Sequence, residues 1–360
     1  MKIAIVTDAW LPQTNGVVTT LSRTSEALTR SGYTVRMFTP SPYRTIACPS
    51  YPEIQLALFA GRRLRRALDA FAPDSIHIAT EGPPGLAARR YCIRRKLSFT
   101  SSYHTQFPAY VRQRYPIPER WTYWFVRWFH NAAAATLVPT PTVIKELQRN
   151  GLRNPVLWGR GVDTDLFKPL AVRTEQPKRP TYLYVGRVSV EKNIEAFAQM
   201  QVDARKLIVG DGPDLAQLKR RFPDCEFTGY KFGVELANII AAADVFVFPS
   251  RTDTFGLVML EAMACGVPVA AYPVAGPIDV VLDGVTGVLH ESLELAAQRA
   301  LAISRESCRR HALSRSWENC TQQFLSNLVR ACDAHPLQHV QPTSTSPLAA
   351  INSLTQSEPR

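Results

Sequence analysis

Strand-like and helix-like runs alternate from end to end of this chain, and this alternation restricts its fold more than any other feature. In the first half, strands are predicted at residues 2–8, 33–40, 75–80, 97–104, 135–140 and 155–159, and helices near 17–30, 61–71, 84–95, 119–133 and 141–150. Strands that alternate with helices are typical of a parallel sheet whose crossovers are helical. The sequence therefore predicts an α/β protein with doubly wound sheets.

The alternation is interrupted once, by a segment rich in proline and charge at residues 168–180, which is predicted to be a linker. It restarts with strands predicted at 181–186, 206–212, 225–229, 244–250 and 267–273. We therefore expect two Rossmann-like domains, residues 1–170 and 171–333, with the final helices packing back on the first domain. Residues 334–360 are predicted to be a disordered tail. Ligands should bind in a cleft between the domains, at the carboxyl ends of both sheets.

The net positive charge of the chain comes entirely from its first half. Residues 1–170 carry 23 Lys and Arg against 10 Asp and Glu, whereas residues 171–360 carry 19 against 20. The arginines gather at 61–68, at 88–96 and around the aromatic run RWTYWFVRWFH at 120–130. Basic residues beside Trp and Tyr suit an anionic membrane surface, and they also suit nucleic acid. The alternative, equally open for any one cluster, is that the aromatic residues are core and the arginines a solvated face.

The remaining bulk properties indicate an intracellular protein. Seven cysteines without a CxxC pair argue for a reducing cytoplasm and against a disulfide framework or a zinc site. No apolar run reaches membrane-spanning length. The first ten residues read as a strand rather than a signal peptide, because they lack a basic leading region and a cleavage site of small residues.

The stretch SRTDTFGLVMLEAMACG at residues 250–266 places two acids eight positions apart, directly after a buried strand. Asp253 is predicted to lie in the turn before a helix that starts near residues 254–256 and stops at Gly266. Glu261 falls on the same predicted face as Leu257 and Leu260, where a carboxylate is costly unless a partner hydrogen-bonds it. The simpler alternative is that Asp253 is only a helix N-cap and that Glu261 lies at the edge of the apolar stripe.

Four other loops at predicted strand ends carry residues suited to ligand binding. Gly16 begins a helix after the first strand, so backbone there can approach a phosphate, although the absence of GxGxxG argues against NAD. Arg187 and Lys192 share a loop before a helix and could neutralise a diphosphate. His104 ends a strand of the first domain, and Asp211 lies in a Gly-Asp-Gly turn. Each also has a structural alternative, such as a turn glycine, a surface ion pair or a structural histidine.

The order and spacing of these motifs resemble those of the retaining nucleotide-sugar glycosyltransferases of family 4, which have the GT-B architecture of two Rossmann-like domains facing a central cleft. The resemblance covers about residues 1–330. It is closest to bacterial GDP-mannose-dependent α-mannosyltransferases and to lipid glycosyltransferases such as sulfoquinovosyl-diacylglycerol synthase. The segments SYHTQFPAYVRQRY and WGRGVDTDLFKP carry this closer match.

The resemblance implies a role for each candidate residue in the second domain. Arg187 and Lys192 would bind the donor diphosphate and stabilise the leaving group. Asp253 would hold hydroxyls of the donor sugar, and Glu261 would bind the ribose. Backbone groups of residues 254–257, which are Thr254, Phe255, Gly256 and Leu257, would surround the sugar.

Three further assignments follow from the same resemblance. His104 matches a histidine near the anomeric centre, Gly16 a loop glycine beside the diphosphate, and Asp211 a residue of the donor-side turn. The sequence departs from the usual family pattern at Asp253, where glutamate is common. Because the aspartate reaches one methylene less far, the identity of the donor sugar is what this departure puts in question.

The function that these features imply is transfer of a hexose, with mannose from GDP-mannose favoured, to a hydroxyl of a lipid or glycolipid. The reaction is expected to retain the anomeric configuration and to need no metal or other cofactor. The protein is expected to be cytoplasmic, peripheral on the inner face of the plasma membrane. A non-catalytic nucleotide-sugar-binding homologue and a transferase acting on a soluble or polyprenyl-linked saccharide are the alternatives. Nucleic-acid binding would leave the motifs of the second domain unexplained, so no nucleic-acid partner is expected.

Overall fold

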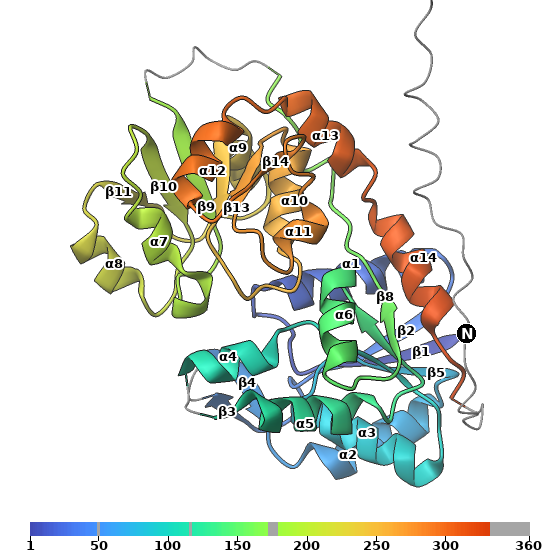
Figure 1. Cartoon of the computed structure of the whole chain (residues 1–360). Coiled ribbons are helices and arrows are strands. Elements are labelled where there is room, and N and C mark those ends of the chain that lie inside the picture. The colour runs from blue at the N-terminus through green and yellow to red at the C-terminus, as the bar shows by residue number, and fades with distance from the viewer. Residues whose placement is uncertain (49–50, 115–116, 172–178, 332–360) are drawn as a thin grey trace, which may run out of the picture.

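The chain forms two domains, each built on its own six-stranded parallel sheet (Figure 1). The structure, a computed structural model, describes residues 1–48, 51–114, 117–171 and 179–331. The strand order is β2-β1-β5-β6-β7-β8 in the first sheet and β11-β10-β9-β12-β13-β14 in the second. In both sheets the order reverses beside the first strand, which is the doubly wound arrangement predicted from the sequence. The fold class is therefore confirmed.

The N-terminal domain combines the first sheet with a small antiparallel hairpin. Its sheet consists of β1 (Lys2–Val6), β2 (Thr34–Phe38), β5 (Ser75–Ile78), β6 (Thr100–Ser102), β7 (Ala135–Val138) and β8 (Pro155–Leu157), and its hairpin of β3 (Thr45–Cys48) and β4 (Tyr51–Ala57). Its helices are α1 (Gly16–Arg30), α2 (Ala60–Phe71), α3 (Pro83–Arg95), α4 (Phe107–Arg114), α5 (Glu119–His130) and α6 (Pro141–Arg149).

The C-terminal domain repeats the same plan. Its strands are β9 (Thr181–Val185), β10 (Arg205–Val209), β11 (Cys225–Phe227), β12 (Val245–Phe248), β13 (Val269–Ala271) and β14 (Gly287–Leu289). Its helices are η1 (Val190–Lys192), α7 (Ile194–Ala198), α8 (Leu215–Arg221), α9 (Gly233–Ala242), α10 (Leu257–Ala264), α11 (Pro277–Val280), α12 (Leu293–Ala300), α13 (Arg305–Leu313) and α14 (Trp317–Asn327).

The central strand β12 shows why the second sheet is parallel and covered on both faces. All four of its residues are buried. Phe246 and Phe248 pack into one apolar cluster with α9 and α10, whereas Val245 and Val247 pack into another with α7 and α12. Alternate side chains thus enter opposite layers, and this explains why the strand reads as a continuous hydrophobic run.

The sequence missed three strands and, in the first domain, one helix. Every strand that it placed is present, but the β3–β4 hairpin, helix α4 and strand β14 were not predicted. Strands β3 and β14 have only four and three residues, and residues 107–118 contain three prolines, which are typical of a loop. The predicted linker lies partly, and the predicted tail wholly, outside the described residues.

The last helix returns to the first domain. Figure 1 shows α13 beside the C-terminal domain and α14 lying against the N-terminal domain, where it packs on α1. The Trp158 indole donates a hydrogen bond of 3.1 Å to the carbonyl of Cys320 in α14, and both residues belong to a cluster that includes Phe324. Among the described residues, no helix is both long and apolar enough to cross a bilayer.

Candidate active site

Two charged side chains meet where adjacent strands of the second sheet end. Lys192 ends η1 shortly after β9, and Asp253 lies in the loop after β12, the neighbour of β9. Lys192 Nζ donates to both carboxylate oxygens of Asp253, at 2.6 and 2.9 Å. The alternative of a surface ion pair is therefore wrong for Lys192, because its partner is the partly buried Asp253, while the nearby Glu195 pairs with Arg221.

The surroundings of Lys192 keep its side chain charged. Burial by itself would lower the pKa of Lys192, but attraction to the Asp253 carboxylate, with contributions from Tyr184 and Glu191, raises the pKa above its usual value. The two side chains keep only 22% and 15% of their surface exposed. The pair is therefore a cation and an anion held in a partly desolvated position, where each acts more strongly on a ligand than it would in water.

Helix α10 begins directly after this pair. Its N-cap is Gly256, with a φ of 81°, and no side chain caps the helix. The alternative in which Asp253 is only an N-cap is therefore wrong. A Cβ atom at Gly256 would lie 2.8 Å from both Met259 and Phe248. Glycine thus gives the left-handed turn that brings Asp253 and the first turn of α10 together.

Glu261 lies in the middle of α10 as predicted, on a largely buried helix. Leu260 and Ala264 beside it are fully buried, and Glu261 itself is half-buried. No described residue hydrogen-bonds its carboxylate, and burial raises the pKa of Glu261 to about 7. A carboxyl group in such a place is costly to ionise without a partner, which is the situation that the sequence predicted.

The N-terminal domain meets α10 through its own strand ends. Gly16 is the first residue of α1, and a Cβ atom there would contact the Leu257 side chain at 3.4 Å. Thr254 donates a hydrogen bond of 2.6 Å from its hydroxyl to the carbonyl of His104, and its own carbonyl accepts from Thr140 at 3.3 Å. Four predicted site residues from both domains are therefore neighbours across the domain boundary.

The His104 ring is fixed by a buried arginine that the sequence reading did not single out. Arg160 Nη2 donates to His104 Nδ1 at 3.1 Å, while Nη1 donates to the carbonyls of Trp158 and Gly159. Guanidinium is only a donor, so Nδ1 must accept and the neutral ring carries its proton on Nε2. Burial and then the Arg160 charge hold the pKa of His104 well below its usual value. Nε2 is buried without a partner among the described residues.

The remaining candidates lie on the same side of the second domain. Phe255 is buried between Thr254 and Gly256 in the loop before α10. Arg187 is half-buried in the loop of Lys192, and its carbonyl accepts from the Tyr184 hydroxyl at 2.9 Å. Asp211 is exposed, and its carboxylate accepts from the backbone of Gly212 at 2.6 Å. The contacts of Asp211 are therefore those of a turn.

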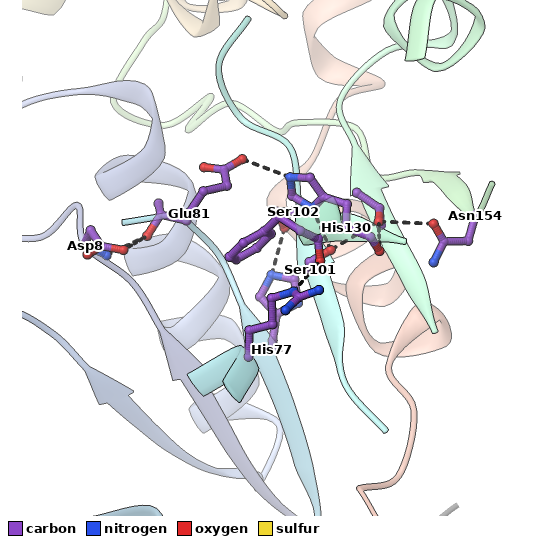
Figure 2. Close-up of polar contacts among 11 residues, drawn as sticks. Asp8, His77, Glu81, Ser101, Ser102, His130 and Asn154 are labelled. Atoms are coloured by element: carbon purple, nitrogen blue, oxygen red, sulfur yellow. Dashed lines mark hydrogen bonds and ion pairs between the residues drawn. The ribbon is translucent and has the colours of Figure 1, made fainter. Parts of the chain in front are cut away.

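A buried polar network under the first sheet's carboxyl edge was missed by the sequence reading (Figure 2). His130 contacts Ser101 at 2.9 Å and Glu81 at 3.0 Å, and His77 contacts Ser102 at 2.8 Å. Ser101, His130 and Glu81 are hydrogen-bonded in series, as are the serine, histidine and acid of a hydrolytic triad. The Ser101 side chain is 0% exposed, however, so no substrate can reach it.

Burial shifts the pKa values of two titratable groups near this network. Burial lowers the pKa of His77 to about 3 and raises that of Asp8 to about 6. Thr80 donates to Asp8 at 2.7 Å, whereas the second carboxylate oxygen of Asp8 has no partner among the described residues. Polar residues inside the strands, such as those of SIHIAT and SFTSSYH, were the available signal for this network.

Two Rossmann-like domains that meet at the carboxyl edges of their sheets have the architecture of GT-B glycosyltransferases. Comparison with protein families agrees. Residues 14–166 match the model described as Glycosyltransferase Family 4, and residues 179–305 match the model described as Glycosyl transferases group 1.

Curated relatives match between about two thirds and nine tenths of this chain. A GDP-mannose-dependent alpha-mannosyltransferase of Mycobacterium tuberculosis is 31% identical, with 91% of this chain and 96% of the relative covered. The sulfoquinovosyl transferase SQD2 of Arabidopsis thaliana is 34% identical over 68% of this chain and 52% of its own length. An alpha-monoglucosyldiacylglycerol synthase of Streptococcus pneumoniae is 29% identical over 76% and 71%. The chain belongs to glycosyltransferase family 4.

A solved structure shows the same fold. The sucrose-phosphate synthase of Thermosynechococcus elongatus superimposes with a TM-score of 0.73 at 23% identity, covering 90% of this chain and 97% of its own. The resemblance predicted from the sequence motifs is therefore confirmed at the level of family and architecture.

Proposed function

We propose that this glycosyltransferase transfers a hexose to a hydroxyl of a lipid or glycolipid, with mannose from GDP-mannose as the favoured donor sugar. The observation that carries the proposal is the pairing of Lys192 with Asp253 at the ends of β9 and β12, just before α10, the helix that carries Glu261. A nucleotide sugar requires a cation for its diphosphate and acids for the hydroxyls of its sugar and ribose, and we assign these roles to Lys192, Asp253 and Glu261. The name of the mycobacterial relative favours GDP-mannose.

The proposed chemistry follows from where negative charge develops. When the bond between sugar and phosphate breaks, the nucleoside diphosphate gains charge beside Lys192, and the fixed ammonium group stabilises that charge without rearrangement. Arg187, on the same loop, would add a second donor. We propose that the reaction needs no metal ion and that the acceptor attacks from the face that the diphosphate leaves, so that the anomeric configuration is retained.

Within this scheme His104 supports the donor from the other domain. Its proton is held on Nε2 by Arg160, so the ring would donate a hydrogen bond to a donor oxygen instead of accepting the acceptor's proton. The departing phosphate would then take that proton. Closure of the two domains over both substrates would exclude water and limit hydrolysis.

The acceptor is proposed to come from a membrane. The excess of 13 positive charges in residues 1–170 suits a surface of anionic lipid, and one relative is named as a diacylglycerol glycoside synthase. On this basis we propose that the protein works in the cytoplasm, as a peripheral protein on the inner face of the plasma membrane. A soluble or polyprenyl-linked saccharide is the competing acceptor.

The proposal is tested by a binding screen of nucleotide sugars, followed by incubation of the best donor with lipid extracts and with soluble saccharides. We expect GDP-mannose to bind best, a mannolipid to form in the presence of EDTA, and its anomeric proton to show the α configuration by NMR. Binding without transfer or hydrolysis of any donor would instead support the non-catalytic homologue. A product formed only on soluble saccharide would refute the lipid acceptor.

A further inference from the structure

Helix α5 exposes three tryptophans on one face. Trp121, Trp124 and Trp128 are 59%, 56% and 43% exposed, and their spacing of three and four residues places them on a single stripe. The rings of Trp124 and Trp128 stack at 6.4 Å with an interplanar angle of 12°. The opposite face, with Tyr123 and Phe129, is buried. The alternative that the aromatic residues of this run are core is therefore wrong for the three tryptophans, whereas it holds for Phe129.

Arginines surround this tryptophan stripe. The guanidinium of Arg89 lies 3.9 Å from the Trp128 ring centre. Arg127 and Arg153 line a shallow groove of about 340 Å³ together with Trp124 and Trp128. The combination of amphipathic rings with cations on one surface is typical of a helix that lies in a membrane interface.

Acidic groups do not cancel this charge. Glu119 is the one acid within α5, and Arg112 pairs with it at 2.9 Å. Arg120 is exposed on the same helix and stacks over Trp121 at 5.9 Å. The surface is thus apolar in its middle and positive at its rim, which complements an anionic lipid surface better than a neutral one.

The apolar surface extends from α5 towards the candidate active site. Phe107 is 41% exposed, begins α4 three residues after His104, and contacts the Phe125 ring of α5 at 5.9 Å. Helix α4 packs along α5, as Figure 1 shows. A lipid that leaves the bilayer beside α5 would therefore follow an apolar surface to the strand end that carries His104.

We propose that the tryptophan stripe of α5 lies in the headgroup region of an anionic bilayer, with the surrounding arginines paired to lipid phosphates. This inference rests on the proposed function and deepens it, since it names the surface through which the enzyme reaches its membrane. Indole rings suit that depth because their flat apolar bodies meet acyl chains while their N–H groups remain hydrated.

Vesicle binding tests the proposal directly. The full chain is mixed with vesicles of phosphatidylcholine alone or with about 30% phosphatidylglycerol, and bound protein is measured by sedimentation. We expect binding to the anionic vesicles, a blue shift of tryptophan fluorescence and quenching by brominated acyl chains. In the variant Trp121→Ala/Trp124→Ala/Trp128→Ala, binding should fall by roughly tenfold or more. Arg120→Gln/Arg153→Gln should weaken binding mainly at low salt.

A matched control is available in the other domain. Phe232 is 56% exposed and stacks on Tyr230 at 5.8 Å, but it lies outside α5. Phe232→Ala should leave vesicle binding unchanged. Equal binding of the triple tryptophan variant and the wild type would overturn the proposal. So would a concentration-dependent dimer that the triple variant abolishes, because the stripe would then contact a second copy of the chain.

Transfer to a short-chain, water-soluble acceptor separates this inference from the proposed function. The triple tryptophan variant should transfer hexose to that acceptor at about the wild-type rate, since none of the three side chains belongs to the candidate active site. Absence of transfer by the wild type to every acceptor would refute the proposed function. Vesicle binding that depends on the tryptophan stripe would still stand in that case.

Discussion

Replacing Glu261 by glutamine should make the protein more stable and its donor binding weaker. Burial raises the pKa of Glu261 from 4.5 to about 7 in the folded chain. The folded state therefore favours the protonated form, and ionisation at neutral pH opposes folding. Each pKa unit corresponds to about 1.4 kcal/mol, so the penalty is about 3 kcal/mol. Glutamine keeps the shape of the side chain and removes this penalty.

The sign of the effect fixes its pH range. Below pH 4.5 the carboxyl group is protonated in both states, and the glutamine variant and the wild type should be equally stable. As the pH rises from 4.5 to about 7, the wild type loses stability relative to Glu261→Gln, and the difference stays constant at higher pH. Urea unfolding at a series of pH values from 4 to 8, about half a unit apart, measures this difference.

Donor binding should change in the opposite direction. A hydrogen bond from a ribose hydroxyl to the ionised carboxylate is charge-assisted and contributes about 1.5–3 kcal/mol to binding. Glu261→Gln should therefore weaken the binding of GDP or GDP-mannose about 10- to 100-fold. The affinity of the wild type for GDP-mannose should rise as the pH rises towards 7, because donor binding releases the proton of Glu261.

Asp8→Asn is the matched control for this experiment. Its pKa is also raised by burial, from 3.8 to about 6, but the residue lies in the other domain and has no predicted donor contact. We expect it to gain about 3 kcal/mol of stability at pH 8 and to keep donor affinity. If Glu261→Gln is less stable than the wild type at pH 8, or binds donor equally well, the role inferred for Glu261 is incorrect.

Three further predictions concern the charged and polar groups around the donor. Lys192→Met should abolish transfer and cost about 3 kcal/mol of stability, because Asp253 is left partly buried and unpaired. The double variant Lys192→Met/Asp253→Asn should recover the stability but not the activity. Transfer activity in either variant would contradict the diphosphate role of Lys192. Asp253→Glu should change relative kcat/KM values among GDP-hexoses, whereas an unchanged preference would show that its length does not select the sugar. Arg160→Met should let the His104 proton exchange between both ring nitrogens, which the imidazole 15N shifts would report, and should lower kcat about tenfold. If the His104 ring of the wild type carries its proton on Nδ1, the hydrogen bond from Arg160 to Nδ1 is excluded.

The sequence predicted the two sheets well because their strands are continuous apolar runs separated by regular helices. The candidate donor residues could be placed for a related reason, and their role stays a prediction. Lys192 and Asp253 lie in the segments that follow the buried strands β9 and β12, and parallel strands deliver their carboxyl ends to one edge. The pairing of Lys192 with Asp253 could not be predicted, because 61 positions separate them and only the adjacency of β9 and β12 brings them together.

The polar network of the N-terminal domain was harder to predict because its residues lie inside the strands. His77, Ser101 and Ser102 occupy β5 and β6, where polar side chains read as interruptions of an apolar pattern. Their partners are far apart in the chain, as in the contact of His130 with Glu81 across 49 positions. Periodicity predicts which face a side chain occupies but not which polar group will satisfy it.

The Lys192–Asp253 pair gives a physical reason for an aspartate at this position. Without donor, the two groups satisfy each other at 2.6 and 2.9 Å, so neither remains partly buried and unpaired. A donor diphosphate would compete for Lys192, and its sugar hydroxyls would supply Asp253 with new hydrogen-bond donors, so binding exchanges one set of partners for another. A glutamate is one methylene longer, so its carboxylate would lie at a different position beside the donor sugar. We therefore predict that the length of this acid affects both the stability of the free site and the hydroxyl that it would contact, and comparing unfolding with donor preference in Asp253→Glu separates the two effects.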